Sequence, residues 1–242
     1  MTRPALLDNV THRHLRVHTG RSAALGDARQ SVLALPAEFR QLQAHFPIVF
    51  QHLDGPDGDG GFQPIALLGL EEGQNLFLTE AGWDAPVMPM AMQRDPFLIG
   101  RSGDSLQLHI DLDSPRLVRP EEGEVGTALF LPHGGHSDYL EHVVSLLEHL
   151  HAHAQHLPDF IAALTRHQLL EPFVLDVELG DGSQSRLSGL FTVHEERLAA
   201  LPGAALEALA RDHHLLPIYM QLASMAQLPG LVERYNRRNR IG

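Results

Sequence analysis

Apolar and polar residues alternate in several short segments of the chain, and this period of two predicts β-strands. The clearest segment is SLQLHID, residues 105–111, and the shorter RHLRV, 13–17, is expected to form an edge strand. FPIVFQH, 46–52, is predicted as a further strand. Two more apolar segments, 64–70 and 75–79, are separated by EEGQ, so we predict that they form a hairpin.

The segment FVLDVELGDGSQSRLSGLFTV, residues 173–193, predicts a second and longer hairpin. Phe173, Leu175, Val177 and Leu179 lie at every second position and would share one face of its first strand. The GDG that follows is typical of a turn, and the remaining residues supply the return strand.

Other segments repeat their apolar residues with the spacing of a helix. In LPAEFRQLQAHF, 35–46, the residues Phe39, Leu42 and Phe46 recur at that spacing, and a proline lies near the first turn. This segment is therefore predicted to be helical.

The middle of the chain predicts two consecutive helices. Ser137 is a favourable N-cap, with Glu141 close behind it, for a helix that is expected to run to about His156. Pro158 ends that helix, and residues 158–168 are predicted to form the next one.

From Glu195 onward the chain is again predicted to be helical, with Gly203, Pro217 and Pro229 as interruptions. The basic tail, RYNRRNRIG, is expected to fray.

These elements together predict an α+β fold, in which antiparallel strands and hairpins pack with a segregated set of helices. We expect one domain over residues 1–242. The alternative is a subdivision near residue 132, between a β-rich N-terminal part and a helix-rich C-terminal part.

Composition and charge exclude several classes of function. The formal net charge of −12 repels nucleic acid, so no DNA or RNA partner is expected. The chain has no cysteine, which excludes thiol catalysis and thiolate zinc sites, and it has no lysine for a Schiff base or a P-loop. Protonation of the 17 histidines would more than cancel the negative charge, so the surface charge should change strongly as the pH becomes acidic.

The location expected from the sequence is the cytoplasm. The N-terminal segment carries charges throughout and lacks the apolar core of a secretion signal. No stretch approaches the roughly 18 uninterrupted apolar residues of a membrane helix, so no membrane insertion is expected. Association with the cell surface is left open.

Five histidines occur within the predicted helix segment HVVSLLEHLHAHAQH, residues 142–156. On a helical wheel the apolar residues form one stripe, and four of the histidines form another stripe about 130° away. The four are His142, His149, His153 and His156. Because one helix face brings no further ligand from another element, we interpret it as a solvated face that could capture metal adventitiously, not as a dedicated metal site.

His109 and Asp111 form an H-x-D pattern on a predicted strand, where the period of two places both side chains on one face. This is the first half of the two-histidine, one-carboxylate iron site of 2-oxoglutarate oxygenases, and His167 or His194 could supply the third ligand. The alternative function is thus a non-heme iron oxygenase with iron and 2-oxoglutarate. The competing interpretation is a half-buried strand with a polar face, for which no cofactor or metal is expected.

A series of short segments extends over almost the whole chain. It begins with HRHLRV, LPAEF and FPIVF, continues with ALLGL, GQNLF, GW, RDPF and IDLDSPRL, and ends with LLEPF, LSGLFTV, ERLAALP and IYMQLASM. This series, in this order, resembles the SapC family of bacterial proteins, named for a surface-layer gene locus. The resemblance implies an accessory role linked to surface-layer or outer-membrane uptake systems.

The resemblance is concentrated around GW, RDPF and IDLDSP, so Trp83, Arg94 and Asp111 are the candidate binding residues. The first hypothesis is a non-enzymatic binding or accessory protein whose partner is an unidentified protein, peptide or carbohydrate. The second is the oxygenase, with His109, Asp111 and His194 as metal ligands. The third is a surface-associated structural protein, which would self-assemble.

Overall fold

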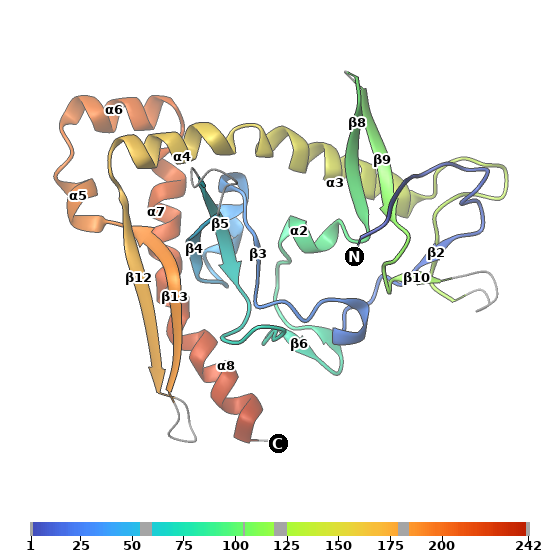
Figure 1. Ribbon diagram of the computed structural model, residues 1–242, viewed down its shortest axis with the longest axis horizontal. Helices are drawn as coiled ribbons and strands as arrows, with labels where there is room; N and C mark the ends of the chain where they lie inside the picture. The colour runs from blue at the N-terminus through green and yellow to red at the C-terminus, as the bar shows by residue number, and fades with distance from the viewer. Residues whose placement is uncertain (1, 54–59, 104, 119–124, 179–183, 241–242) are drawn as a thin grey trace. The chain divides into compact units, whose positions relative to one another are not determined.

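The computed structural model describes residues 2–53, 60–103, 105–118, 125–178 and 184–240 (Figure 1). The chain divides into two compact units, which are described separately below. The first unit comprises Met1–Ala28, Leu78–Asp84 and Met90–Ala152, and the second comprises Arg29–Phe77, Ala85–Pro89 and His153–Gly242. The expectation of a single domain, or of a subdivision near residue 132, stays a prediction.

The second unit is built on a five-stranded antiparallel sheet with the strand order β12-β13-β4-β5-β3 (Figure 1). The strands are β3 (Ser31–Leu33), β4 (Ile48–His52), β5 (Phe62–Leu67), β12 (Leu170–Glu178) and β13 (Gln184–Val193). In the central strand β4, the consecutive residues Ile48, Val49 and Phe50 are all buried, because the strand is covered on both faces. The predicted α+β class is confirmed.

The long hairpin predicted over residues 173–193 is confirmed by the antiparallel pairing of β12 with β13. Its register shifts between Phe173 and Leu175, where the extra residue of the bulge lies in β13. The alternation predicted for Phe173, Leu175 and Val177 is kept in β12, since the residues between them are exposed. The predicted GDG turn and Leu179 fall outside the residues that the structure describes.

The hairpin predicted between residues 64–70 and 75–79 is wrong. β5 pairs with β4 along one edge and with β3 along the other. Beyond the end of β5 the Leu76 N–H donates a hydrogen bond to the Leu68 carbonyl oxygen (2.8 Å), but residues 75–77 do not form a strand. Instead, β6 (Leu78–Thr79) pairs with β7 (Gly82–Trp83) within the first unit.

The helices of the second unit follow the predicted segments closely. They are η2 (Pro36–Glu38), α1 (Phe39–Leu42), α4 (Leu157–Arg166), α5 (Glu195–Ala199), α6 (Gly203–Arg211), α7 (Leu215–Ser224), η4 (Met225–Gln227) and α8 (Leu228–Arg240). The helix predicted over residues 35–46 is confirmed in a shorter form, and the helix at 158–168 and the helical region after Glu195 are confirmed.

The expectation of a frayed C-terminal tail is wrong, since α8 continues to Arg240. Tyr235 is buried and its hydroxyl lies 2.6 Å from a carboxylate oxygen of Glu71, which accepts its hydrogen bond. Arg238 donates a hydrogen bond of 2.8 Å to the carbonyl oxygen of Asn75. These contacts attach the end of α8 to the segment after β5.

Aromatic rings fill the core of the second unit. The rings of Phe39 and Phe160 meet edge to face with centroids 6.2 Å apart, and those of Phe46 and Phe77 with centroids 4.7 Å apart. Phe50 lies 6.4 Å from Phe160. All five rings are buried, so Phe160 joins α4 to the sheet through aromatic packing.

Helix α7 is attached to the sheet by two buried polar side chains. β13 and β4 pair only near Phe191 and Phe50, and beyond that point their ladder ends. Gln221 accepts a hydrogen bond from the Val193 N–H (3.2 Å) and donates one to the Ile48 carbonyl oxygen (2.8 Å). The Ser224 hydroxyl accepts a hydrogen bond from the Ile48 N–H (2.9 Å). The two side chains therefore replace ladder hydrogen bonds that the strands do not make with each other.

Among the residues that the structure describes, the helical run Leu215–Asn239 has an 18-residue window apolar enough to cross a membrane, with a mean hydropathy of 1.2 and 28% of it buried. Core helices of globular proteins meet this criterion of length and composition too. The cytoplasmic location and the absence of membrane insertion, both expected from the sequence, stay predictions.

The first unit contains two three-stranded sheets, with the orders β1-β9-β8 and β10-β2-β11, and the β6–β7 hairpin. The strands are β1 (Pro4–Leu6), β2 (Arg16–Val17), β8 (Phe97–Ser102), β9 (Ser105–Asp111), β10 (Leu117–Val118) and β11 (Thr127–Ala128). β9 confirms the strand predicted at 105–111. The expectation of an edge strand at 13–17 is wrong, because β2 is short and lies between two partners.

The first unit also contains a 3-10 turn, η1 (Ala23–Leu25), a short helix, α2 (Met90–Gln93), and most of the long helix α3 (Asp138–Ala154). The predicted N-cap of α3 is confirmed, since the Ser137 hydroxyl accepts a hydrogen bond from the Leu140 N–H (3.3 Å). The four-histidine face of residues 142–156 is exposed, as predicted.

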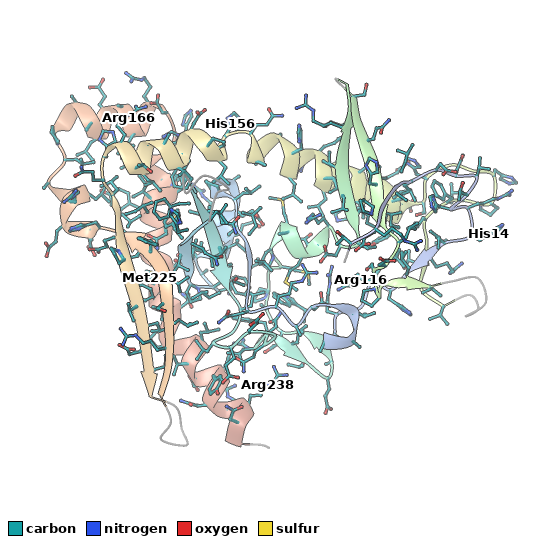
Figure 2. All side chains as sticks on the ribbon, viewed as in Figure 1. His14, Arg116, His156, Arg166, Met225 and Arg238 are labelled. Atoms are coloured by element: carbon teal, nitrogen blue, oxygen red, sulfur yellow. The ribbon has the colours of Figure 1, made fainter. Side chains whose placement is uncertain are left out.

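A buried ion pair lies in the core of the first unit, where the side chain of Asp27 is 0% exposed and that of Arg116 is 1% exposed. The Arg116 guanidinium donates hydrogen bonds to the Asp27 carboxylate and to the carbonyl oxygen of Gly20 (2.8 Å). The same carboxylate accepts hydrogen bonds from the Ser22 N–H (2.9 Å) and from Arg21 (3.3 Å). Burial lowers the pKa of Arg21. The pair thus fixes the loop that contains η1. Figure 2 labels Arg116.

We expect Asp27→Asn to lower the free energy of unfolding of the first unit by about 3–5 kcal/mol, because it leaves the buried Arg116 charge without its partner. The matched control, Asp113→Asn, removes the exposed pair with Arg3 and should cost less than about 1 kcal/mol. Urea unfolding followed by the fluorescence of Trp83, the single tryptophan, measures both. Equal losses of stability in the two variants would contradict the role of the buried pair. The double variant Asp27→Leu, Arg116→Met, which replaces both charges with apolar side chains, should recover much of the stability that Asp27→Asn loses.

Candidate functional site

The three candidate binding residues, Trp83, Arg94 and Asp111, all belong to the first unit. Arg94 is half-buried and donates a hydrogen bond to the carbonyl oxygen of Phe97 (3.0 Å). The Asp111 carboxylate accepts a hydrogen bond from the Arg3 N–H (2.8 Å). Both charged groups thus hold segments of their own chain, and Trp83 is half-buried in β7.

Arg94 and Asp111 nevertheless lie on neighbouring segments, because the Asp111 N–H donates to the carbonyl oxygen of Pro96 (3.0 Å). None of the three candidate residues lines the cavity described below. Their role in binding stays a prediction.

The imidazole of His109 is packed against Gly100, which lies diagonally across the β8–β9 ladder. A Cβ atom added to Gly100 would lie 2.0 Å from Cε1 of His109, so the ring occupies the space that a side chain would need. The backbone of Gly100 does not adopt a left-handed conformation, so this close approach is the constraint at that position. Nδ1 of His109 is buried and has no hydrogen-bond partner among the described residues.

His194, the candidate third ligand of the iron site, serves instead as the N-cap of α5. Its Nδ1 accepts a hydrogen bond from the Arg197 N–H (3.4 Å), and its Nε2 lies 3.8 Å from Glu171. Within the described part of the chain, no group of three or more histidine and carboxylate side chains is placed to hold a metal ion. A metal-binding role for His109, Asp111 and His194 stays a prediction.

A cavity of about 760 Å³ lies in the second unit, between α4, the end of α6 and the start of α7. Figure 1 shows α4 and α6 beside each other, and Figure 2 labels His156 and Arg166 at the two ends of α4. Part of the lining is apolar and buried, and comes from Phe160, Leu209 and Pro217.

Eight ionisable side chains line this cavity, and five of them are histidines. They are His153, His156, Asp159, Arg166 and His167 from the α3–α4 region, and Asp212, His213 and His214 from the α6–α7 junction. All eight are exposed or half-buried, so they can reach a ligand without unfolding of the helices. We refer to this feature as the histidine-lined cavity.

Helix ends determine where these side chains lie. Pro158 occupies the first turn of α4, which makes His156 the N-cap and His167 the C-cap of that helix. Asp212 is the C-cap of α6, and His213 follows it with a φ of 60°. This left-handed residue ends α6 and lets the chain turn into α7.

His214, the N-cap of α7, is half-buried. Its ring meets that of Phe160 with centroids 5.7 Å apart, and its Nδ1 is buried with no hydrogen-bond partner in the described structure. Burial lowers the pKa of His214, while the nearby carboxylates of Asp212 and Asp159 act in the opposite direction. His214 therefore favours the neutral form, in which one ring nitrogen can accept a hydrogen bond.

The lining of the cavity combines apolar side chains and imidazole rings with hydrogen-bond donors and acceptors. His153 and His156 were predicted as part of a solvated face, which is correct, but the sequence did not show that they also border a cavity. That arrangement depends on residues some 50 positions later in the chain. The DHH sequence at 212–214 is the signal that could have indicated it.

The fold and cavity define an α+β protein with a recess of the size that small-molecule sites have. A comparison with protein families gives a match to the SapC model over residues 7–231, so the chain belongs to the SapC family. No curated protein and no solved structure matches the chain. The resemblance drawn from the short segments is confirmed.

Because His109 packs on Gly100, we expect Gly100→Ala to lower the free energy of unfolding by about 1–3 kcal/mol through overpacking. The same change in a His109→Ala background should cost much less, and Gly20→Ala, where the added Cβ meets nothing within 4 Å, is the control. Urea unfolding of the native protein, Gly100→Ala, His109→Ala and the double variant gives the coupling free energy between positions 100 and 109.

The metal content of untagged protein, measured by mass spectrometry, should be the same in His109→Ala as in the native protein. Near-stoichiometric iron that disappears in the variant would contradict the structural role of His109 and support the oxygenase.

The lowered pKa of His214 predicts that this residue makes the fold less stable in acid. With a folded-state pKa below the ordinary 6.5, the unfolded chain binds the proton more readily, so stability is lost as the pH falls through 6.5 toward the folded value. His214→Phe keeps a ring against Phe160 and should reduce the loss of stability between neutral and acidic pH. The control is His149→Phe, at an exposed position, which should leave that loss unchanged. Thermal unfolding at several pH values compares the native protein with the two variants. Equal pH dependence in all three proteins would contradict the role of His214.

Proposed function

We propose that this SapC-family protein is a non-enzymatic binding protein with an accessory role, and that the histidine-lined cavity is its small-molecule site. The observation that carries this proposal is the cavity of about 760 Å³ with eight ionisable side chains on its wall. Small-molecule sites commonly have volumes of about 300–1,000 Å³, an apolar lining and a few polar groups that orient the ligand.

The structure around the cavity favours binding over a purely structural role. Phe160 and Leu209 are buried beneath the polar wall, so the cavity has a rigid floor. The polar side chains of the lining are mostly exposed, and Asp212 is paired with its exposed neighbour Arg211 (3.5 Å). This differs from Arg94 and Asp111, whose side chains hold backbone groups of their own unit.

The ligand of such a site is a compound of a few polar groups, such as a carboxylic acid, a sugar or a short peptide. The accessory role itself is supported by the family resemblance alone. No metal or cofactor is needed for the proposed function.

Ligand-observed NMR with a mixture of amino acids, simple sugars, carboxylic acids and phosphate esters tests the proposal. Ala162→Trp places a large ring at an exposed position of α4 that borders the cavity, and we expect it to abolish the signal of any compound that binds there. Ala210→Trp is the matched control, because Ala210 is exposed on α6 and does not line the cavity. The proposal fails if no compound binds, or if every binding compound is unaffected by Ala162→Trp.

A further inference from the structure

The lining of the histidine-lined cavity carries little net charge when its histidines are neutral. Arg166 stands against Asp159, and the Asp212 carboxylate is paired with Nε of Arg211 at 3.5 Å. Histidine is the side chain that gains charge between pH 8 and pH 5, and each protonation adds one positive charge to the wall. The residues Pro36 and Ala37, which complete the lining, carry no charge that would oppose this change.

Three of the histidines lie where a positive charge is favoured. His153 is in the last turn of α3, His167 is the C-cap of α4, and His213 follows the C-cap of α6. The peptide dipoles at the C-terminus of a helix stabilise a cation there. Burial lowers the pKa of His214, so its ring favours the neutral form.

The N-termini of two helices border the same cavity. His156 and His214 are the N-caps of α4 and α7, and neither side chain makes a capping hydrogen bond. The first-turn N–H groups of these helices are thus not satisfied by their N-cap side chains, and helix N-termini favour negatively charged ligands. This feature adds to the charged lining of the cavity, which carries the argument.

We infer that the cavity takes a small polyvalent anion, bearing carboxylate or phosphate groups, and holds it more tightly at acidic than at neutral pH. This inference rests on the proposed function, because it names the ligand class of the same cavity. Arg166 can bind an oxyanion through two parallel hydrogen bonds, and charged imidazoles strengthen the others. The rings of Phe160 and His214 would contact the carbon skeleton of an organic anion.

Isothermal titration calorimetry with citrate measures this directly, in sulfonate buffers at constant chloride. We expect citrate to bind at least about tenfold more tightly near pH 5.5 than near pH 7.5, since the histidines gain their charge in that interval. Inorganic phosphate in a parallel titration distinguishes a phosphate site from a carboxylate site. Glucose, which carries no charge, should show no such pH dependence.

Two substitutions locate the binding. Arg166→Gln and His156→Gln should each weaken citrate binding in acid by about fivefold, since each removes a charge-assisted hydrogen bond. Arg40→Gln and His149→Gln are the matched controls, because both residues are exposed and lie outside the cavity. Citrate affinity in the controls should equal that of the native protein.

The inference is overturned if citrate and phosphate both fail to bind in acid, if they bind equally at the two pH values, or if the controls weaken binding as much as the cavity variants. The last result would mean adsorption to a protein surface that becomes positive overall. A sugar or peptide that Ala162→Trp displaces, together with no anion binding, would leave the proposed function standing and overturn the ligand class alone.

Discussion

The side-chain amide of Gln221 is the contact on which the arrangement of the second unit depends. It satisfies the Val193 N–H and the Ile48 carbonyl oxygen where β13 and β4 stop pairing with each other. A buried backbone group without a hydrogen-bond partner costs about 1–3 kcal/mol. The two strands can separate there because Gln221 of α7 supplies the partners that they no longer give each other. The position of α7 in turn fixes His214 at its N-terminus, and with it one wall of the cavity. The geometry of the site therefore follows from a hydrogen-bonding requirement of the sheet.

The segments that carry the family resemblance supply the anchors of the fold. Arg116 belongs to IDLDSPRL and forms the buried pair with Asp27, while Gln221 belongs to IYMQLASM and joins α7 to the sheet. Arg94 belongs to RDPF and also holds its own backbone. A resemblance built on such residues indicates a shared fold, because their side chains are engaged within the protein. It gives little information about the proposed ligand, because the residues that line the cavity, apart from Pro36 and Ala37, lie outside those segments.

Local sequence patterns predicted the structure correctly where it depends on interactions between residues close together in the chain. The β12–β13 hairpin, β9, the Ser137 N-cap and the exposed histidine face of residues 142–156 all follow from periodicity or from a single capping residue. The failures concern pairing between distant segments. β5 was assigned to the wrong partner and β2 to a sheet edge, because these strands pair with residues 32 to 112 positions away. The cavity was missed for the same reason, since its two walls are formed by α4 and by the α6–α7 junction. The tail was expected to fray because its sequence is basic, whereas Tyr235 and Arg238 find acceptors more than 160 residues earlier.

The anion binding proposed for the histidine-lined cavity would be thermodynamically linked to protonation of its histidines. An anion that binds the charged imidazoles more tightly must also promote their protonation, by the same free energy. His214 acts against this coupling, since burial favours its neutral form and the fold loses stability when acid forces a proton onto it. Because the ring of His214 packs on Phe160 and favours the neutral form, the core packing around Phe160 does not depend on a charge at that position.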